Sequence, residues 1–196
     1  LIINQCMKIN IMQFIIYLTF VFAFSELLLM IIRHSKIETA KTRKDRGSMI
    51  LLWTMITLGF TGGFFLAKHD SWNSVNSVIA GIGLLLVLSG IIIRWVSIVQ
   101  LGKSFTVDVA ITNLTRLKTD GLYLHVRHPS YLGLLLIIIG FSVTMNSFIS
   151  SFVLVIPVFL ATSYRITVEE KVLVSEFGDS YKEYKVKTKK LIPGIY

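Results

Sequence analysis

The chain has 196 residues, of which 54% are hydrophobic and 16% are charged, and its mean hydropathy is +0.70. These values exclude an ordinary soluble globular protein and predict an integral membrane protein. Membrane orientation and anionic lipids account for the formal net charge of +9, and no stretch interleaves basic and aromatic residues as an RNA-binding sheet does, so we predict no nucleic-acid partner.

Three apolar runs near the start of the chain are long enough to cross a bilayer, which requires about 20 helical residues. They are residues 9–32, 49–67 and 78–99. Glu26 interrupts the first run and is interpreted as a packing or headgroup contact, while Arg94 near the end of the third run is interpreted as a snorkelling charge. Glycines in the third run predict close helix packing rather than a dinucleotide-binding loop, because no strand precedes them.

A polar stretch, residues 101–130, follows the third run and has no sustained helical or strand period. We predict an ordered cytoplasmic loop that ends where a helix begins. Pro129 suits the first position of that helix, and His128 then stands at its cap. The N–H groups of the first helical turn lack partners within the helix, so this end favours an anion such as a carboxylate.

The next apolar region, residues 131–163, has too many residues for one span and too few for two ordinary spans with a turn. With a bend at residues 144–147, it predicts two short or tilted helices in a hairpin. The predicted fold is therefore all-α and polytopic, with about five transmembrane helices, the last two forming the hairpin, and with a cytoplasmic loop and a C-terminal helical tail.

The distribution of Lys and Arg predicts the orientation of these segments. Residues 33–48 hold six basic residues and residues 101–130 hold four, whereas the loop at 68–76 holds only Lys68. Seven more follow in the tail from residue 164. Because short cytoplasmic loops carry the excess of positive charge, we predict an N-terminus outside and a cytoplasmic C-terminus.

Polar residues flank the predicted hairpin on both sides. Arg165 and Glu169 lie at i and i+4, on one helical face, and Gly178 is predicted to stop that helix. The hairpin should bring His128, Tyr131, Arg165 and Glu169 to the same cytoplasmic rim, where ionisable groups are functional candidates. Two alternatives stay open, namely a snorkelling interfacial His128 and a simple helix-stabilising Arg165–Glu169 pair. The histidines lack metal-ligand spacing, so we predict no metal.

The second half of the chain carries a specific set of motifs in a fixed order: "GLYLHVRHPSYLG", "SYRITVEE", "FGDSYKEYKVKT" and "LIPG". In these motifs the chain resembles the isoprenylcysteine carboxyl methyltransferase family and the related phospholipid methyltransferases. The resemblance covers about half of the chain. Length and the apolar runs predict a single domain over residues 1–196 with three transmembrane helices in 1–100, and the resemblance implies that 101–196 is the cofactor-binding catalytic region.

The resemblance implies an S-adenosylmethionine-dependent methyltransferase that acts on a lipophilic acceptor at the cytoplasmic side. The activity that it favours is that of a protein-S-isoprenylcysteine carboxyl O-methyltransferase. It implies catalytic roles for Arg165, His128 and Tyr131, with Arg165 also holding the substrate. The cofactor-binding residues that it implies are Thr115, Arg116, Leu117, Lys118, Tyr123, His128, Pro129, Ser130, Tyr131 and Glu169. Many family members have His-x-Leu-Val where this chain has "TRLK", so contacts there are expected through the backbone.

Several alternatives stay open from the sequence. The acceptor is either a prenylated cysteine or a small lipophilic molecule, and a thiol, amine or enol acceptor would make His128 or Tyr131 the candidate base. An NADPH-dependent membrane reductase of the sterol-reductase type is the second enzymatic reading. A small non-enzymatic membrane protein is the third, although a transporter usually places its charges at the bilayer midplane. Membrane lipids are expected partners, and the oligomeric state stays open.

Overall fold

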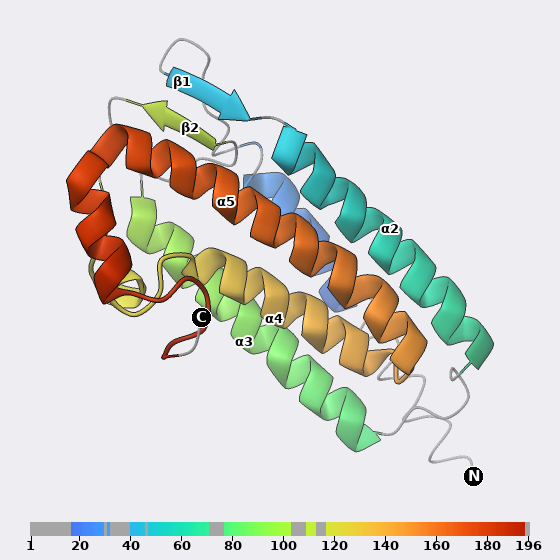
Figure 1. The fold of residues 1–196 in the computed structure, drawn as a ribbon. Coiled ribbons are helices and arrows are strands. Elements are labelled where there is room, and N and C mark those ends of the chain that lie inside the picture. The colour runs from blue at the N-terminus through green and yellow to red at the C-terminus, as the bar shows by residue number, and fades with distance from the viewer. Residues whose placement is uncertain are drawn as a thin grey trace.

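The computed structural model describes residues 17–29, 31, 40–45, 47–70, 77–102, 109–112 and 117–194. Helices dominate this part of the chain, and the long ones run side by side as a bundle (Figure 1). The elements are the apolar helix Tyr17–Leu29, strand β1 (Ala40–Asp45), helix α2 (Gly47–Asp70), helix α3 (Ser77–Leu101), strand β2 (Val109–Thr112), the 3-10 helix η4 (Gly121–Leu124), helix α4 (Pro129–Thr144) and helix α5 (Phe148–Lys187).

The apolar helices occupy the positions predicted for membrane segments. Three of the described helices, α2, α3 and α5, are long and apolar enough to cross a bilayer, and Tyr17–Leu29 and α4 are shorter apolar helices. Large hydrophobic side chains such as Phe20, Leu58, Leu85 and Phe152 are at least 60% exposed, as expected where lipid replaces water. The predicted all-α, polytopic membrane fold is confirmed, while the crossing of the bilayer by the two shorter helices stays a prediction.

Helices α3 and α4 pack closely because glycines face one another across their interface. A Cβ on Gly83 would lie 2.7 Å from the Gly140 carbonyl oxygen, and a Cβ on Gly90 would lie 2.6 Å from the Gly133 carbonyl oxygen. Both helices therefore carry glycines seven residues apart. Because glycine has no side chain, the two backbones can pack in direct contact, which is how helices associate in lipid, where no hydrophobic effect drives them together. The prediction of close packing for the glycines of the third run is confirmed at Gly83 and Gly90, whereas Gly81 faces open space.

The predicted hairpin is present and turns where expected. Helix α4 ends at Thr144, and Ser147 caps α5 by accepting a hydrogen bond from the Ser150 N–H over 3.3 Å. Helix α5 does not end with the apolar region at residue 163, because its buried face continues into the C-terminal tail. It bends at Gly178, whose φ of 53° and ψ of −125° are not helical, so the predicted stop appears as a kink.

The loop predicted for residues 101–130 contains a strand that the sequence pattern did not reveal. Strand β2 pairs with β1 in an antiparallel two-stranded sheet, at the end of the bundle where α2 begins (Figure 1). A strand of four residues is too short to give a recognisable period, and its partner lies about 70 residues earlier in the chain. The sheet is a small addition to an otherwise helical fold.

The segment after α5 folds back onto the start of α4. Arg127 N–H donates to the Lys189 carbonyl oxygen over 2.8 Å, and His128 N–H donates to the Lys190 carbonyl oxygen over 3.2 Å. Leu191 is only 2% exposed and packs in one cluster with Leu135 and Ile166. The C-terminal segment is therefore part of the structure around the first turn of α4.

Candidate functional site

The first turn of α4 lies where the sequence predicts it. Pro129 occupies the first helical turn, and His128 is the cap residue, although its side chain makes no capping hydrogen bond. The His128 carbonyl oxygen accepts hydrogen bonds from the N–H groups of Tyr131 and Leu132, each over 3.1 Å. Since proline has no N–H, the number of N–H groups left for an anion at this helix start is smaller than the sequence analysis implied.

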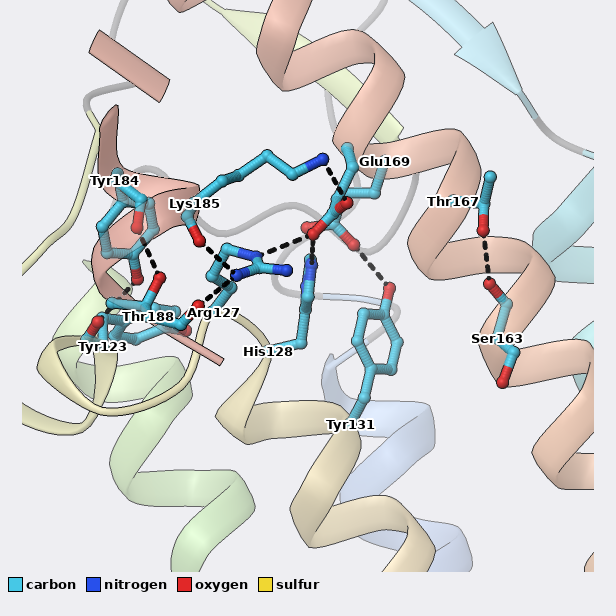
Figure 2. Close-up of polar contacts among 11 residues, drawn as sticks. Tyr123, Arg127, His128, Tyr131, Ser163, Thr167, Glu169, Tyr184, Lys185 and Thr188 are labelled. Carbon is cyan, nitrogen blue, oxygen red and sulfur yellow. Dashed lines mark hydrogen bonds and ion pairs between the residues drawn. The ribbon is translucent and has the colours of Figure 1, made fainter. Parts of the chain in front are cut away.

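Arg165, Tyr131 and Glu169 form a row of hydrogen bonds between α4 and α5. Arg165 Nε–H donates to the Tyr131 hydroxyl over 2.9 Å. The Tyr131 hydroxyl donates to Glu169 Oε2 over 2.9 Å, as Figure 2 shows. Arg165 is 4% exposed and also donates to Ser48 Oγ over 3.0 Å. The two α5 residues are thus linked through a phenol from α4, a relation that their i, i+4 spacing alone does not give.

Glu170, next to Glu169, is the centre of a buried cluster of charges. Its carboxylate lies 2.8 Å from Arg127 Nε, 3.0 Å from Lys185 Nζ and 3.4 Å from His128 Nε2. Figure 2 shows the side chains of Arg127, Lys185 and His128 pointing toward one another, with dashed lines that meet between them. Burial opposes ionisation of Glu170, but the neighbouring His128, Arg127 and Lys185 side chains outweigh it and hold the pKa of this carboxyl well below its usual range.

His128 is buried in this cluster with one ring nitrogen unsatisfied. The residue is 4% exposed, and among the described residues Nε2 makes no hydrogen bond, although Glu170 lies 3.4 Å away. The imidazole ring lies 5.8 Å from the Tyr131 ring, measured between centroids. A buried polar atom without a partner is costly, so this nitrogen is suited to receive or donate a hydrogen bond to a bound molecule.

Tyr123 makes hydrogen bonds that link neighbouring elements of the structure. Its hydroxyl donates to the Ser97 carbonyl oxygen over 3.3 Å, and its own carbonyl oxygen accepts from the Tyr184 hydroxyl over 2.6 Å. Burial first, and then the negative charge of Glu169, raise the pKa of the Tyr123 phenol well above its usual range. Tyr123 is therefore a neutral donor that connects α3, η4 and the end of α5.

The remaining predicted cofactor residues are less closely tied to these groups. Pro129 and Ser130 are buried in the first turn of α4. Leu117 and Lys118 are half-buried and precede η4, and Lys118 Nζ pairs with Asp120 over 2.9 Å. Thr115 and Arg116 lie outside the described residues. Within the described part of the chain, no three His, Cys, Asp or Glu side chains are placed to hold a metal ion, and the absence of a metal stays a prediction.

The sequence analysis missed an ion pair inside the bundle. Arg94 donates to both carboxylate oxygens of Glu26, through Nε to Oε1 and through Nη2 to Oε2, the latter over 2.6 Å. Glu26 is 3% exposed and the Arg94 side chain is 11% exposed, so both charges are buried within the bundle, in contrast to the snorkelling charge predicted for Arg94. One acidic and one basic residue in separate apolar runs were the signal that could have predicted this pair.

The comparison with protein families gives one match. Residues 82–175 match the isoprenylcysteine carboxyl methyltransferase (ICMT) family. The matched region includes α4, the apolar part of α5 and the residues Tyr131, Arg165, Glu169 and Glu170.

Two curated relatives are similar over more than half of the chain. The protein-S-isoprenylcysteine O-methyltransferase of Schizosaccharomyces pombe is 40% identical over 105 residues, which are 53% of this chain and 44% of the relative. Protein-S-isoprenylcysteine O-methyltransferase B of Arabidopsis thaliana is 32% identical over 119 residues, which are 60% of each chain. The matched region thus spans about half the length of these relatives.

One solved structure has a similar fold. It is the eukaryotic intramembrane Ras methyltransferase ICMT, with a TM-score of 0.67 and 24% sequence identity. The similarity covers 96% of this chain and 68% of that one, so it extends to the helices before the matched family region.

Proposed function

This chain belongs to the isoprenylcysteine carboxyl methyltransferase family, and on that premise we propose that it transfers a methyl group from S-adenosylmethionine to a lipophilic acceptor. The favoured acceptor is the carboxylate of a prenylated cysteine, since the similar curated proteins are named protein-S-isoprenylcysteine O-methyltransferases. A small lipophilic molecule is the alternative acceptor.

The observation that supports this proposal most is the row formed by Arg165, Tyr131 and Glu169. It puts a buried guanidinium and a half-buried carboxylate about two hydrogen bonds apart, at the point where the apolar half of α5 gives way to its charged half. A guanidinium fork suits a carboxylate acceptor, and a carboxylate suits the ammonium group of a methionine moiety. Arg165 therefore suits the acceptor carboxylate, and Glu169 suits the ammonium group of the methyl donor.

The residues present fit S-adenosylmethionine. Glu169 uses one carboxylate oxygen for Tyr131, and among the described residues its other oxygen accepts no hydrogen bond, which leaves it for an ammonium group. His128 Nε2 is buried and, within the part of the chain that the structure describes, makes no hydrogen bond, although Glu170 lies 3.4 Å away. We propose that these two side chains hold the cofactor together with the remaining predicted residues, namely Thr115, Arg116, Leu117, Lys118, Tyr123, Pro129, Ser130 and Tyr131.

The chemistry requires alignment more than acid or base strength. When bound, the cofactor supplies a methyl group on a sulfonium, whose C–S bond breaks as the acceptor oxygen forms its bond to the methyl carbon, so a carboxylate acceptor needs no general base. Arg165 then orients the acceptor, Tyr131 fixes Arg165 relative to Glu169, and the surrounding apolar helices exclude water. The Tyr131 hydroxyl donates a hydrogen bond to Glu169 and accepts one from Arg165, which favours an orienting role for Tyr131 over the role of a general base.

We also propose that the site faces the cytoplasm. The excess of Lys and Arg in residues 33–48, in residues 101–130 and after residue 164 supports a cytoplasmic C-terminus and an N-terminus outside. The charged cluster around Glu170 lies at the polar end of α5, consistent with this side. Acceptor lipids would reach the site from the bilayer between the helices.

Cofactor binding tests this function directly. Detergent-purified protein is titrated calorimetrically with S-adenosylmethionine and S-adenosylhomocysteine, with NADPH as the probe for a reductase. We expect saturable binding of the two adenosyl compounds, loss of that binding in Glu169→Ala, and normal binding in Glu176→Ala, which removes an exposed carboxylate from the same helix. Binding of NADPH alone by folded protein would instead favour a reductase.

Methyl transfer is tested with radiolabelled S-adenosylmethionine and N-acetyl-S-farnesylcysteine. Arg165→Lys keeps the charge but loses the planar fork, so we expect a raised KM for the acceptor together with a lower kcat. Unchanged turnover and unchanged acceptor affinity in Arg165→Lys would contradict the orienting role of Arg165.

A further inference from the structure

The ion pair between Glu26 and Arg94 joins two helices inside the bundle. Glu26 comes from the helix Tyr17–Leu29, and Arg94 comes from α3. The Arg94 side chain is 11% exposed and the Glu26 side chain 4%, so the pair is screened from water. Burying one of these charges without the other would cost free energy, so each side chain needs its partner.

The guanidinium group of Arg94 also reaches the first turn of α4. While Nε and Nη2 hold Glu26, Nη1 donates to the Ser130 carbonyl oxygen over 3.2 Å and to Ser130 Oγ over 3.1 Å. The planar fork of an arginine makes this double engagement possible, because its donors point in fixed and different directions. Glu26 thereby fixes the orientation in which Arg94 meets Ser130.

The backbone of Arg94 lies against the same turn. A Cβ on Gly133 would come within 2.7 Å of the Arg94 backbone nitrogen and within 2.9 Å of Arg94 Cβ. The absence of a side chain at Gly133 thus lets α3 approach α4 one turn after Ser130. Both the backbone and the side chain of Arg94 hold this helix start.

The hydrogen bond from Arg94 determines the direction in which the Ser130 hydroxyl can donate a hydrogen bond. Its oxygen accepts from Nη1, so its own proton points away from Arg94. No acceptor for that proton occurs within the described part of the chain. Ser130 directly follows Pro129 and precedes Tyr131, the residue that donates to Glu169.

We infer that Glu26 and Arg94 are positioning residues, which fix the first turn of α4 and aim the Ser130 hydroxyl at the anionic carboxylate of the adenosyl cofactor. The inference rests on the proposed function, because it names the part of the cofactor that Ser130 serves. It also assigns a role in cofactor binding to the helix Tyr17–Leu29, which lies before the region that matches the family.

Two variants separate positioning from simple stabilisation. Replacing a buried ion pair by apolar residues of similar volume often preserves folding, whereas removing one partner strands the other charge. Glu26→Leu together with Arg94→Met should therefore fold but lose the contact with Ser130. Arg94→Lys keeps a charge for Glu26, yet a single ammonium group cannot serve Glu26 and Ser130 with the geometry of a fork.

The experiment uses the full chain in detergent and three measurements. They are the dissociation constant for S-adenosylhomocysteine, the melting temperature, and hydrogen exchange of a peptide covering residues 126–134. We expect melting temperatures near that of the wild type, faster exchange in this peptide, and an increase in Kd of about tenfold in both variants, the size expected for one lost charge-assisted hydrogen bond. Asp179→Asn is the matched control, since it breaks the exposed pair with Lys182 and should leave all three measurements unchanged.

Wild-type affinity and wild-type exchange in both variants would overturn the inference, because the pair would then only stabilise the bundle. The kinetic parameters give a second criterion: KM for S-adenosylmethionine should rise while kcat at saturating cofactor stays constant. If the wild-type protein binds no S-adenosylhomocysteine, the proposed function and the cofactor part of this inference both fail. Hydrogen exchange then still decides whether Glu26 and Arg94 order the start of α4.

Discussion

The hydroxyl group of Tyr131 donates a hydrogen bond to Glu169 over 2.9 Å, across the contact between α4 and α5. The same oxygen accepts the Nε–H of Arg165. One phenol therefore links a buried cation to a carboxylate.

Tyr131→Phe should impair activity more than folding. The substitution keeps the ring but removes one hydrogen bond from each charged partner, and such bonds contribute about 1.5–3 kcal/mol. We expect kcat/KM to fall about 10- to 100-fold, with a far-UV circular dichroism spectrum like that of the wild type. Tyr164→Phe is the control, since Tyr164 is exposed and should tolerate the change. Equal activities for the two variants would contradict the role of the phenol.

Gly90→Ala should destabilise the bundle. The added Cβ would lie 2.6 Å from the Gly133 carbonyl oxygen and 2.8 Å from the Ile137 backbone nitrogen, so α3 and α4 would have to separate. We expect a loss of about 1–3 kcal/mol, measured as a lower melting temperature in detergent. Gly81→Ala meets no atom within 4 Å and should be neutral or slightly stabilising. If both variants melt at the same temperature, the glycine contacts do not hold the helices together.

Glu170→Gln should make stability less dependent on acid pH. Its neighbours keep the pKa of Glu170 below the usual value of 4.5 in the folded state. A lowered folded-state pKa contributes stability that is complete above the unfolded-state pKa and is lost as the pH falls toward the folded-state pKa. At pH 7 we expect the variant to be less stable by about 3 kcal/mol.

The difference between Glu170→Gln and the wild type should shrink below about pH 4.5, as the wild type begins to lose its advantage. Thermal unfolding between pH 7 and pH 3.5 measures this directly. Glu183→Gln, which changes an exposed carboxylate of the same helix, should follow the wild type at every pH. A constant difference across this range would mean that the charge of Glu170 is not the source of the stability.

Gly178→Ala should loosen the segment after the kink. A φ of 53° with a ψ of −125° is a conformation that a residue with a Cβ adopts only at a cost of about 1–3 kcal/mol. Since nothing lies within 4 Å of the added Cβ, the effect is one of backbone conformation alone. We expect faster hydrogen exchange in residues 179–191 and weaker binding of S-adenosylhomocysteine. Ser180→Ala, an exposed change in the same helix, should exchange like the wild type.

The sequence predicts the helices well because lipid imposes a simple rule on them. Long apolar runs must form helices in hydrocarbon, so α2 and α3 begin and end within three residues of the predicted segments. Pro129 begins a helix as predicted, because its ring fixes φ at a helical value, and Gly178 bends its helix rather than ending it, because glycine adopts a positive φ without steric cost. Local rules of this kind need no knowledge of the partner elements.

The contacts between distant residues could not be predicted in the same way. Arg165 and Glu169 share a helical face, but the sequence does not show that Tyr131 stands between them. Glu26 and Arg94 lie 68 residues apart, and their pairing depends on how two helices are rotated about their axes. Apolar side chains on all sides leave that rotation undetermined, whereas an amphipathic helix would reveal it.

The pairing of the C-terminal segment with the start of α4 has a consequence for biosynthesis. Lys189 and Lys190 accept hydrogen bonds from Arg127 and His128, so residues made late in translation complete a structure whose other half was made about 60 residues earlier. Before the ribosome reaches Lys185, the apolar parts of all the described helices have been synthesised, but Glu170 lacks one of its cations. The charged cluster is therefore completed by residues that are synthesised after the apolar helices.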